Sequence, residues 1–185
     1  MLINYAQTSR SVLGNNFVGL YLLGSLAIGD FDLTSDVDFM VATNHELSDE
    51  DLNRVRWAHT EFVDQDTRWV KHFEYSFFSM QKLHAKSSPY LADGSRNESH
   101  DRQLWYFDNG ARTPVRSDHD NTLVSRWTLR YRSRAVLGPE PTTFAPEVAA
   151  DELRQEIRSS MLGWEKLVIA DAAPFDNRFT RCSWY

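Results

Sequence analysis

The chain has 185 residues, a formal net charge of −6, 42% hydrophobic residues and 13% aromatic residues. This composition supports a sizeable core and excludes general disorder, and the acidic balance argues against a dedicated nucleic-acid surface, which needs dense Lys and Arg. The single cysteine, Cys182, excludes an intrachain disulfide and a cysteine-rich zinc site. The N-terminus has no signal-peptide pattern, and no uncharged run approaches the ~20 residues of a membrane span, so we expect a cytoplasmic protein.

The first part of the chain predicts alternating helices and strands. Residues 3–13 have the apolar spacing of a short helix, and residues 17–23 form a continuous apolar run typical of a strand covered on both faces. A Gly-Ser turn and a short helical connection lead to a second apolar strand over 36–42. Ser48 and Asp51 then form a capping-box pattern that opens a helix. Its apolar positions recur at three and four: Leu52, Val55, Ala58 and Phe62.

Residues 69–80 predict a further strand with two unlike faces. Side chains alternate along a strand, so one face is aromatic, with Phe73, Tyr75 and Phe77. The opposite face carries His72, Glu74 and Ser76. Because this second face is mainly polar, we expect it to border solvent or a cleft.

Residues 81–118 are polar apart from an aromatic island at 104–107, which predicts an added edge strand. Trp105 and Tyr106 could stack on a sugar ring or pack within that strand. The acidic residues of this region could attract a polycation or form a solvated loop: Asp93, Glu98, Asp101 and Asp108.

A helix is predicted from Asp120 to the stop at Gly138-Pro139, with an apolar stripe at Leu123, Trp127, Tyr131 and Ala135. Its arginines at spacing four form either a phosphate-binding face or, more commonly for such a pattern, a solvated face: Arg126, Arg130 and Arg134. After a Pro-rich connection, a last helix is predicted with the stripe Leu153, Ile157, Met161, Trp164 and Val168.

Two short motifs in the first part carry chemistry. Asp36 and Asp38 are one residue apart on a strand, so they share a face, and two carboxylates roughly 6–7 Å apart favour a hard divalent cation between them. Gly24-Ser25, at the start of a helix, suits a phosphate group. Each motif alone is common, and the plain alternative is an ordinary turn with two solvent-facing acids. The combination indicates nucleotide chemistry.

The stretch GLYLLGSLAIGDFDLTSDVDFMV, residues 19–41, resembles the signature of the DNA polymerase β-type nucleotidyltransferase superfamily. It is most similar to the N-terminal domain of streptomycin/spectinomycin-type aminoglycoside adenylyltransferases. VLGPEP at 136–141 and the helix beginning near Asp151 resemble the start of that family's C-terminal helical domain. The resemblance implies an α+β nucleotidyltransferase fold, a mixed sheet flanked by helices, in residues 1–117, and a partial α-helical domain in residues 118–185.

The resemblance also implies roles for individual residues. Asp36 and Asp38 would hold Mg²⁺ at the ATP phosphates, the turn formed by Gly24 and Ser25 would cradle the triphosphate, and Ser35 would contact phosphate.

The family usually has a third carboxylate on a later strand, and we expect it to be Glu74, acting as the catalytic base. The alternatives are an ordinary surface glutamate at this position, or Asp64 or Asp66 in a predicted loop. His72 shares the face of Glu74 and could contact substrate or be an ordinary edge histidine.

The implied function is Mg²⁺-dependent transfer of AMP from ATP to a hydroxyl of a small cationic substrate such as an aminoglycoside, which is an antibiotic-resistance activity. The family's helical domain continues beyond the point where this sequence stops, so two alternatives stay open: an antitoxin-like minimal nucleotidyltransferase that acts as a nucleotide-binding regulatory module, and an inactive truncated remnant. Arg181 lies where a phosphate-binding arginine would be sought, but no motif assigns it. We expect neither a membrane nor a nucleic-acid partner.

Overall fold

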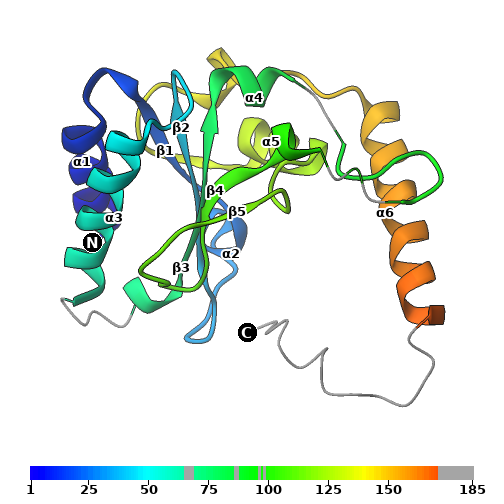
Figure 1. The fold of residues 1–185 in the computed structure, drawn as a ribbon, viewed down its shortest axis with the longest axis horizontal. Helices are drawn as coiled ribbons and strands as arrows, with labels where there is room; N and C mark the ends of the chain where they lie inside the picture. The colour runs from blue at the N-terminus through cyan, green and yellow to red at the C-terminus, as the bar shows by residue number, and fades with distance from the viewer. Residues whose placement is uncertain (65–68, 86–87, 96, 98, 171–185) are drawn as a thin grey trace.

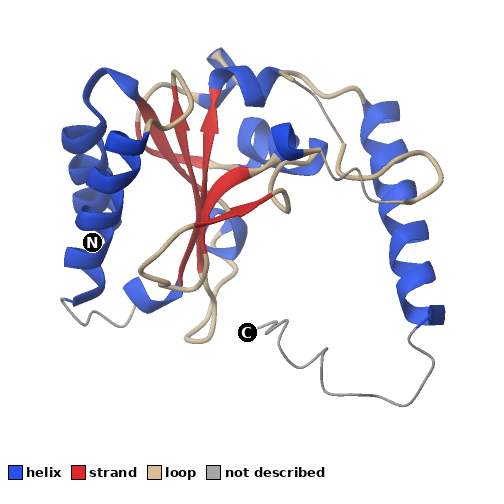
Figure 2. Ribbon diagram, in the orientation of Figure 1, coloured by secondary structure: helices blue, strands red, loops and turns tan. Residues whose placement is uncertain are grey.

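The computed structural model describes residues 1–170 except 65–68, 86–87, 96 and 98. This part of the chain forms a sheet with helices on both sides, as Figure 2 shows. The strands are β1 (Phe17–Leu22), β2 (Val37–Thr43), β3 (Phe73–Ser79), β4 (Leu104–Phe107), β5 (Val115–Ser117) and β6 (Arg134–Leu137). Predictions that concern Arg181 and Cys182 lie outside the described residues.

The six strands lie in the order β5-β4-β3-β2-β1-β6. β2 and β3 run parallel, whereas the other neighbouring pairs are antiparallel, so the sheet is mixed as predicted. The predicted strand over 69–80 begins only at Phe73, because a short 3₁₀ turn occupies Val70–His72.

The helices are α1 (Leu2–Leu13), α2 (Gly24–Ile28), α3 (Asp49–Asp64), α4 (Met80–His84), α5 (Leu123–Arg132) and α6 (Ala150–Ala170). α1 and α3 pack against each other on one side of the sheet, and α5 lies on the other side (Figure 1). No helix in the described part of the chain has the length and apolar character needed to cross a membrane.

Each face of the sheet has its own apolar core. Val37, Phe39 and Val41 of β2 face α1 and α3, together with the aromatic face of β3. Met40 and Ala42, which alternate with them, face α5 and α4. The predicted alternation along β2 is therefore confirmed, and Asp38 belongs to the face that α5 covers.

A buried polar cluster lies between α1, α3 and β3. His59 Nδ1 is 3.0 Å from the Tyr75 hydroxyl and 3.2 Å from the Tyr5 hydroxyl, and the two hydroxyls hydrogen-bond each other. His59 is fully buried, and this burial lowers its pKa to about 4. The ring is therefore neutral in the folded protein at neutral pH.

We expect acid to destabilise the fold through His59. The unfolded chain takes up this proton below its ordinary pKa near 6.5, whereas the folded chain resists until about pH 4. Stability is thus fully present above pH ~6.5 and falls toward pH ~4, by about 3 kcal/mol for this group. The free energy of unfolding, measured with urea at pH 7.5 and pH 4.5, should change less between the two pH values in His59→Gln than in the wild type. An equal change in both proteins would contradict the role of His59.

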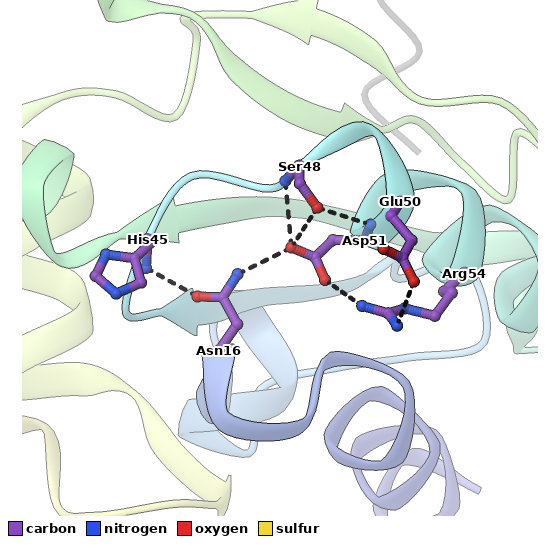
Figure 3. A network of polar contacts seen from close by, with 6 residues as sticks. All are labelled: Asn16, His45, Ser48, Glu50, Asp51 and Arg54. Atoms are coloured by element: carbon purple, nitrogen blue, oxygen red, sulfur yellow. Dashed lines mark hydrogen bonds and ion pairs between the residues drawn. The ribbon is translucent and has the colours of Figure 1, made fainter.

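The predicted capping box at the start of α3 is confirmed (Figure 3). The Asp51 N–H donates to Ser48 Oγ at 3.1 Å, and the Ser48 N–H donates to Asp51 Oδ2 at 3.2 Å. Asn16 donates to the same carboxylate oxygen, and its Oδ1 accepts the His45 N–H. This network ties the turn before β1 to the loop after β2, so it fixes one end of the central strands.

The predicted helix from Asp120 to Gly138 is wrong beyond Arg132. The chain becomes extended at Ser133, whose hydroxyl donates to Leu129 O, and residues 134–137 form β6 along β1. Residues 134–137 extend the sheet at the edge of β1, and this long-range pairing overrides the local helical pattern. The division of the chain into domains at 117/118 stays a prediction.

Of the stripe predicted for α5, Leu123 is buried, Trp127 is half-buried, and Tyr131 and Ala135 are exposed. The buried positions are Leu123, Arg126 and Leu129, while Tyr131 is 49% exposed. Arg126 is completely buried and donates to the carbonyls of Lys82, Leu83 and Thr122 and to Asn121 Oδ1. A cation that is saturated by carbonyl oxygens is neither a phosphate ligand nor part of a solvated face, so both interpretations of Arg126 are wrong.

The other two arginines of that series also bind the chain itself. Arg130 donates to Thr142 O at 2.8 Å and to Ala145 O at 2.6 Å. Arg134 lies on β6 rather than on the helix, and its Nε donates to Ala27 O. They hold the segment after β6 and the helix α2 in place.

The apolar stripe predicted for α6 is also turned away from the core. Met161 is 67% exposed and Trp164 49%, whereas Glu156 and Ser159 are buried. Glu156 Oε1 accepts the N–H groups of Leu123 and Val124 at the start of α5, so a carboxylate caps that helix. This contact ties the buried face of α6 to the start of α5.

Candidate active site

The register of the two parallel strands builds the site. Asp38 on β2 lies directly opposite Glu74 on β3, so the two carboxylates project side by side from one face of the sheet. Val37 and Phe39 face the opposite core, and Asp36 precedes them at the start of the strand. The structure therefore brings together the three carboxylates that the sequence nominated.

Gly24 touches this carboxylate group. The Leu23 N–H donates to Asp38 O at 2.8 Å, which joins the end of β1 to β2. Gly24 has a φ of +61°, and a Cβ at this position would lie 2.1 Å from Asp38 Oδ2. Only glycine fits both the positive φ and this close approach. Ser25 follows Gly24 in the first turn of α2.

Ser35 belongs to a tight loop before β2. Its hydroxyl accepts the Asp32 N–H at 3.0 Å and lies 3.3 Å from Asp32 Oδ1. Thr34 also binds that carboxylate, through its N–H and its hydroxyl. The role of Ser35 as a phosphate contact stays a prediction, and it would require the hydroxyl to be shared with this turn.

Both aspartates have a raised pKa. Burial, with added repulsion from Glu74 and Asp36, raises the pKa of Asp38 to about 6. Burial also raises the pKa of Asp36. Asp36 Oδ1 is buried without a hydrogen-bond donor of normal geometry among the described residues, and His72 Nδ1 faces it at 3.4 Å. A divalent cation would reverse these shifts.

The carboxylates of Asp36 and Asp38 suit Mg²⁺ better than a cation whose ligands must all come from the protein. No group of three or more His, Cys, Asp or Glu side chains is arranged around one metal position in the described part of the chain. Mg²⁺ typically keeps several waters and takes one or two carboxylates plus substrate phosphates. Asp36 and Asp38 supply that pair.

Two residues that were not nominated complete the cluster around Glu74. His119 Nε2 lies 3.5 Å from Glu74 Oε1 and 3.1 Å from Asp120 Oδ1. Ser76, next but one to Glu74 on β3, donates its hydroxyl to Asp120 Oδ2 at 2.6 Å. The His119 pairing outweighs burial and lowers the pKa of Glu74, so this carboxylate is ionised at neutral pH. The sequence signal was Asp118-His119-Asp120 just before a helix, which has no meaning until β3 is placed beside it.

The remaining candidates lie elsewhere or have other partners. Asp64 ends α3 and pairs with Arg112 at the surface, which removes it as a rival of Glu74, and Asp66 lies outside the described residues. Tyr106 packs its ring against His119, whereas Arg116 covers the Trp105 ring at 4.1 Å. Only Tyr106 of the two aromatics therefore borders the site.

Of the acidic residues in the loop region, Asp108 lies near the site. Asp108 accepts a hydrogen bond from the Tyr106 hydroxyl at 3.2 Å, which places it near the site. Asp93 binds Ser95 in a local turn, and Glu98 lies outside the described residues.

These features define a class of protein. Residues 12–86, which contain all of the nominated residues, match the family model described as a nucleotidyltransferase domain. They form a nucleotidyltransferase domain of the DNA polymerase β type, and the α+β fold with a mixed sheet, flanking helices and further C-terminal helices is confirmed.

Among solved structures, the chain is similar to spectinomycin adenyltransferase AAD(9) from Enterococcus faecialis, crystallised with ATP and spectinomycin. The TM-score is 0.59 at 15% identity, and the match covers 90% of this chain and 66% of that one, so the chain spans about two thirds of its length. A toxin–antitoxin structure with AMP-PNP matches at a TM-score of 0.39 and 13% identity, over 92% of this chain and 97% of that one. No curated protein sequence matches the chain.

Proposed function

We propose that the protein is a Mg²⁺-dependent adenylyltransferase that moves AMP from ATP to a hydroxyl of a small cationic acceptor, such as an aminoglycoside. The observation that carries the proposal is the β2–β3 register, which sets Asp38 beside Glu74 with Asp36 at the same edge. The two aspartates have raised pKa values and Glu74 a lowered one, so the three carboxylates differ in the way that a metal pair and a base should differ.

Each residue has a defined task in this reaction. Mg²⁺ held by Asp36 and Asp38 supplies charge neutralisation at the ATP phosphates. Gly24 and Ser25 receive the triphosphate beside Asp38. Glu74 accepts the proton of the attacking hydroxyl, whose oxygen bonds to the α-phosphorus while the bond to the bridging oxygen breaks and pyrophosphate leaves.

The charge around the site supports a cationic acceptor. Asp108 and Asp120 add two carboxylates to the three already described, and the chain as a whole has a net charge of −6. A negative potential of this kind raises the local concentration of an amine-bearing substrate. The similarity to a structure that contains ATP and spectinomycin agrees with this acceptor class.

Labelled ATP tests the proposal directly. The protein is incubated with Mg²⁺ and α-³²P-ATP, with spectinomycin and a panel of aminoglycosides as acceptors. Label is expected to move to at least one aminocyclitol acceptor, with release of pyrophosphate and loss of transfer when EDTA is added. Mg²⁺-dependent ATP binding with no transfer to any acceptor would instead favour the regulatory module, and absence of ATP binding the inactive remnant.

A further inference from the structure

Three apolar side chains form an exposed stripe on α6. Ile157 is 44% exposed, Met161 67% and Trp164 49%, and their spacings of four and three put them on one face of the helix. Apolar residues scattered singly over a surface are ordinary, whereas a contiguous stripe marks an interaction surface. α6 lies at the edge of the molecule, on the side away from α1 and α3 (Figure 1). Another molecule can therefore reach the stripe.

The opposite face of α6 holds the helix in this orientation. Glu156 is buried, and its Oε1 accepts two N–H groups at the start of α5. Gly163 is also buried, and a Cβ added there would lie 2.8 Å from Gly94 O and 3.0 Å from Tyr90 Cε1. Turning the stripe toward the core would break the first contact and push larger side chains into the second. The stripe therefore stays on the outside of the fold, where another surface can cover it.

Two exposed charged side chains lie on one flank of the stripe. Arg158 and Glu165 are seven residues apart, which is about two turns along α6 and about 20° around it. Neither forms an ion pair within the described part of the chain. The flank therefore carries a positive charge at one end and a negative charge at the other, and both are available to a partner.

This arrangement is self-complementary when two copies of α6 pack antiparallel. A two-fold axis beside Met161, midway between Arg158 and Glu165, puts each of these charges level with its opposite in the other copy. Antiparallel helices bring the same flank of each helix side by side, so one ion pair forms at each end of the interface. In a parallel pair, this flank would meet the opposite flank of the partner, and the pairing would be lost. The charge pattern thus favours the antiparallel arrangement.

We propose that α6 is a dimer interface, in which the stripe of Ile157, Met161 and Trp164 packs antiparallel against the same stripe of a second copy, with Arg158 and Glu165 paired across it. A second copy is the occupant because the charges beside the stripe complement those of α6 itself. The inference does not depend on the proposed function, since none of these residues belongs to the site. Residues 171–185 of the same chain are the other possible cover, and the concentration dependence of the mass distinguishes the two.

Sedimentation equilibrium of the full chain, with reductant to keep Cys182 from cross-linking, tests the dimer. The wild type should change from monomer to dimer as its concentration rises from about 1 to about 200 µM. Met161→Glu should weaken dimerisation at least about tenfold, because a carboxylate would be buried among apolar side chains. Trp57→Glu, at a 64% exposed position of α3, is the matched control and should dimerise like the wild type. A Met161→Glu protein that dimerises normally overturns the proposal. A wild type that stays monomeric also overturns it, in favour of cover by residues 171–185.

Charge reversal tests the antiparallel arrangement. Arg158→Glu and Glu165→Arg should each weaken dimerisation about fivefold or more, because each sets like charges opposite one another at both ends of the interface. An equimolar mixture of the two variants should form a heterodimer about as tight as the wild-type dimer, since the flank charges of one chain then face opposite charges of the other. The variant with both substitutions should also dimerise like the wild type. Circular dichroism checks that each variant is folded, and a mixture of folded variants that shows no recovery overturns the proposal.

Discussion

Asp38→Asn is expected to abolish AMP transfer, lowering kcat/KM by at least about 1000-fold, which corresponds to about 4 kcal/mol of transition-state stabilisation. The substitution removes one of two metal-binding carboxylates while it keeps the shape of the side chain. We also expect Mg²⁺-dependent ATP binding, measured by calorimetry, to weaken. Asp30→Asn, an exposed position in the loop after α2, is the matched control and should transfer normally.

The same variant should fold at least as well as the wild type. The pKa of Asp38 is raised from 3.8 to about 6 in the folded protein. The contribution of this side chain to the stability of the fold is therefore fully present below pH 3.8 and is lost as the pH rises through 6. At pH 7 the ionised side chain destabilises the fold, and Asn should raise the free energy of unfolding by about 1–2 kcal/mol. Retained transfer in a well-folded Asp38→Asn protein would refute the metal assignment.

Glu74→Gln should reduce kcat by about 100- to 10,000-fold, because the amide keeps the shape of the side chain but accepts no proton. ATP affinity should stay close to that of the wild type, which distinguishes this variant from Asp38→Asn. The pKa of Glu74 is lowered, so its stabilising effect is present at neutral pH and is lost in acid. Gln should therefore slightly destabilise the fold at pH 7, the opposite of Asp38→Asn.

Asp64→Asn provides the control for this second experiment. Asp64 was the alternative third carboxylate, and it pairs with Arg112 at the surface. Its loss should leave transfer unchanged and cost little stability, as for most exposed ion pairs. If transfer depended on Asp64 and not on Glu74, the assignment of Glu74 as the base would be wrong.

The grouping of the three carboxylates could be predicted because its signals are local. Asp36 and Asp38 share a face by strand periodicity alone, and the polar face of residues 72–76 nominated Glu74. The surroundings of Glu74 could not be predicted in this way. His119 and Asp120 are 45 and 46 residues away from it in the sequence, and they reach it only because β3 and β4 pair in one particular register.

In the second half of the chain, apolar periodicity predicted the wrong buried positions and the wrong element for a physical reason. Arg126 counts as polar in any amphipathic pattern, yet carbonyl oxygens that surround it make it a core residue. Ala135 fits a helical stripe, yet the unpaired edge of β1 recruits it into a strand. In both cases, backbone groups from distant parts of the chain decide the outcome, and a pattern of side chains does not contain them.

The position of β6 also bears on the order of events during synthesis. β1 leads directly into the Gly24-Ser25 turn, yet its outer neighbour is made only after more than 110 further residues, since Leu22 pairs with Arg134. Until residues 134–137 leave the ribosome, β1 is an open edge that can pair with other chains. Contacts of such long sequence separation slow folding, so the strand that leads into the Gly24-Ser25 turn, the turn that we propose receives the triphosphate, is completed late.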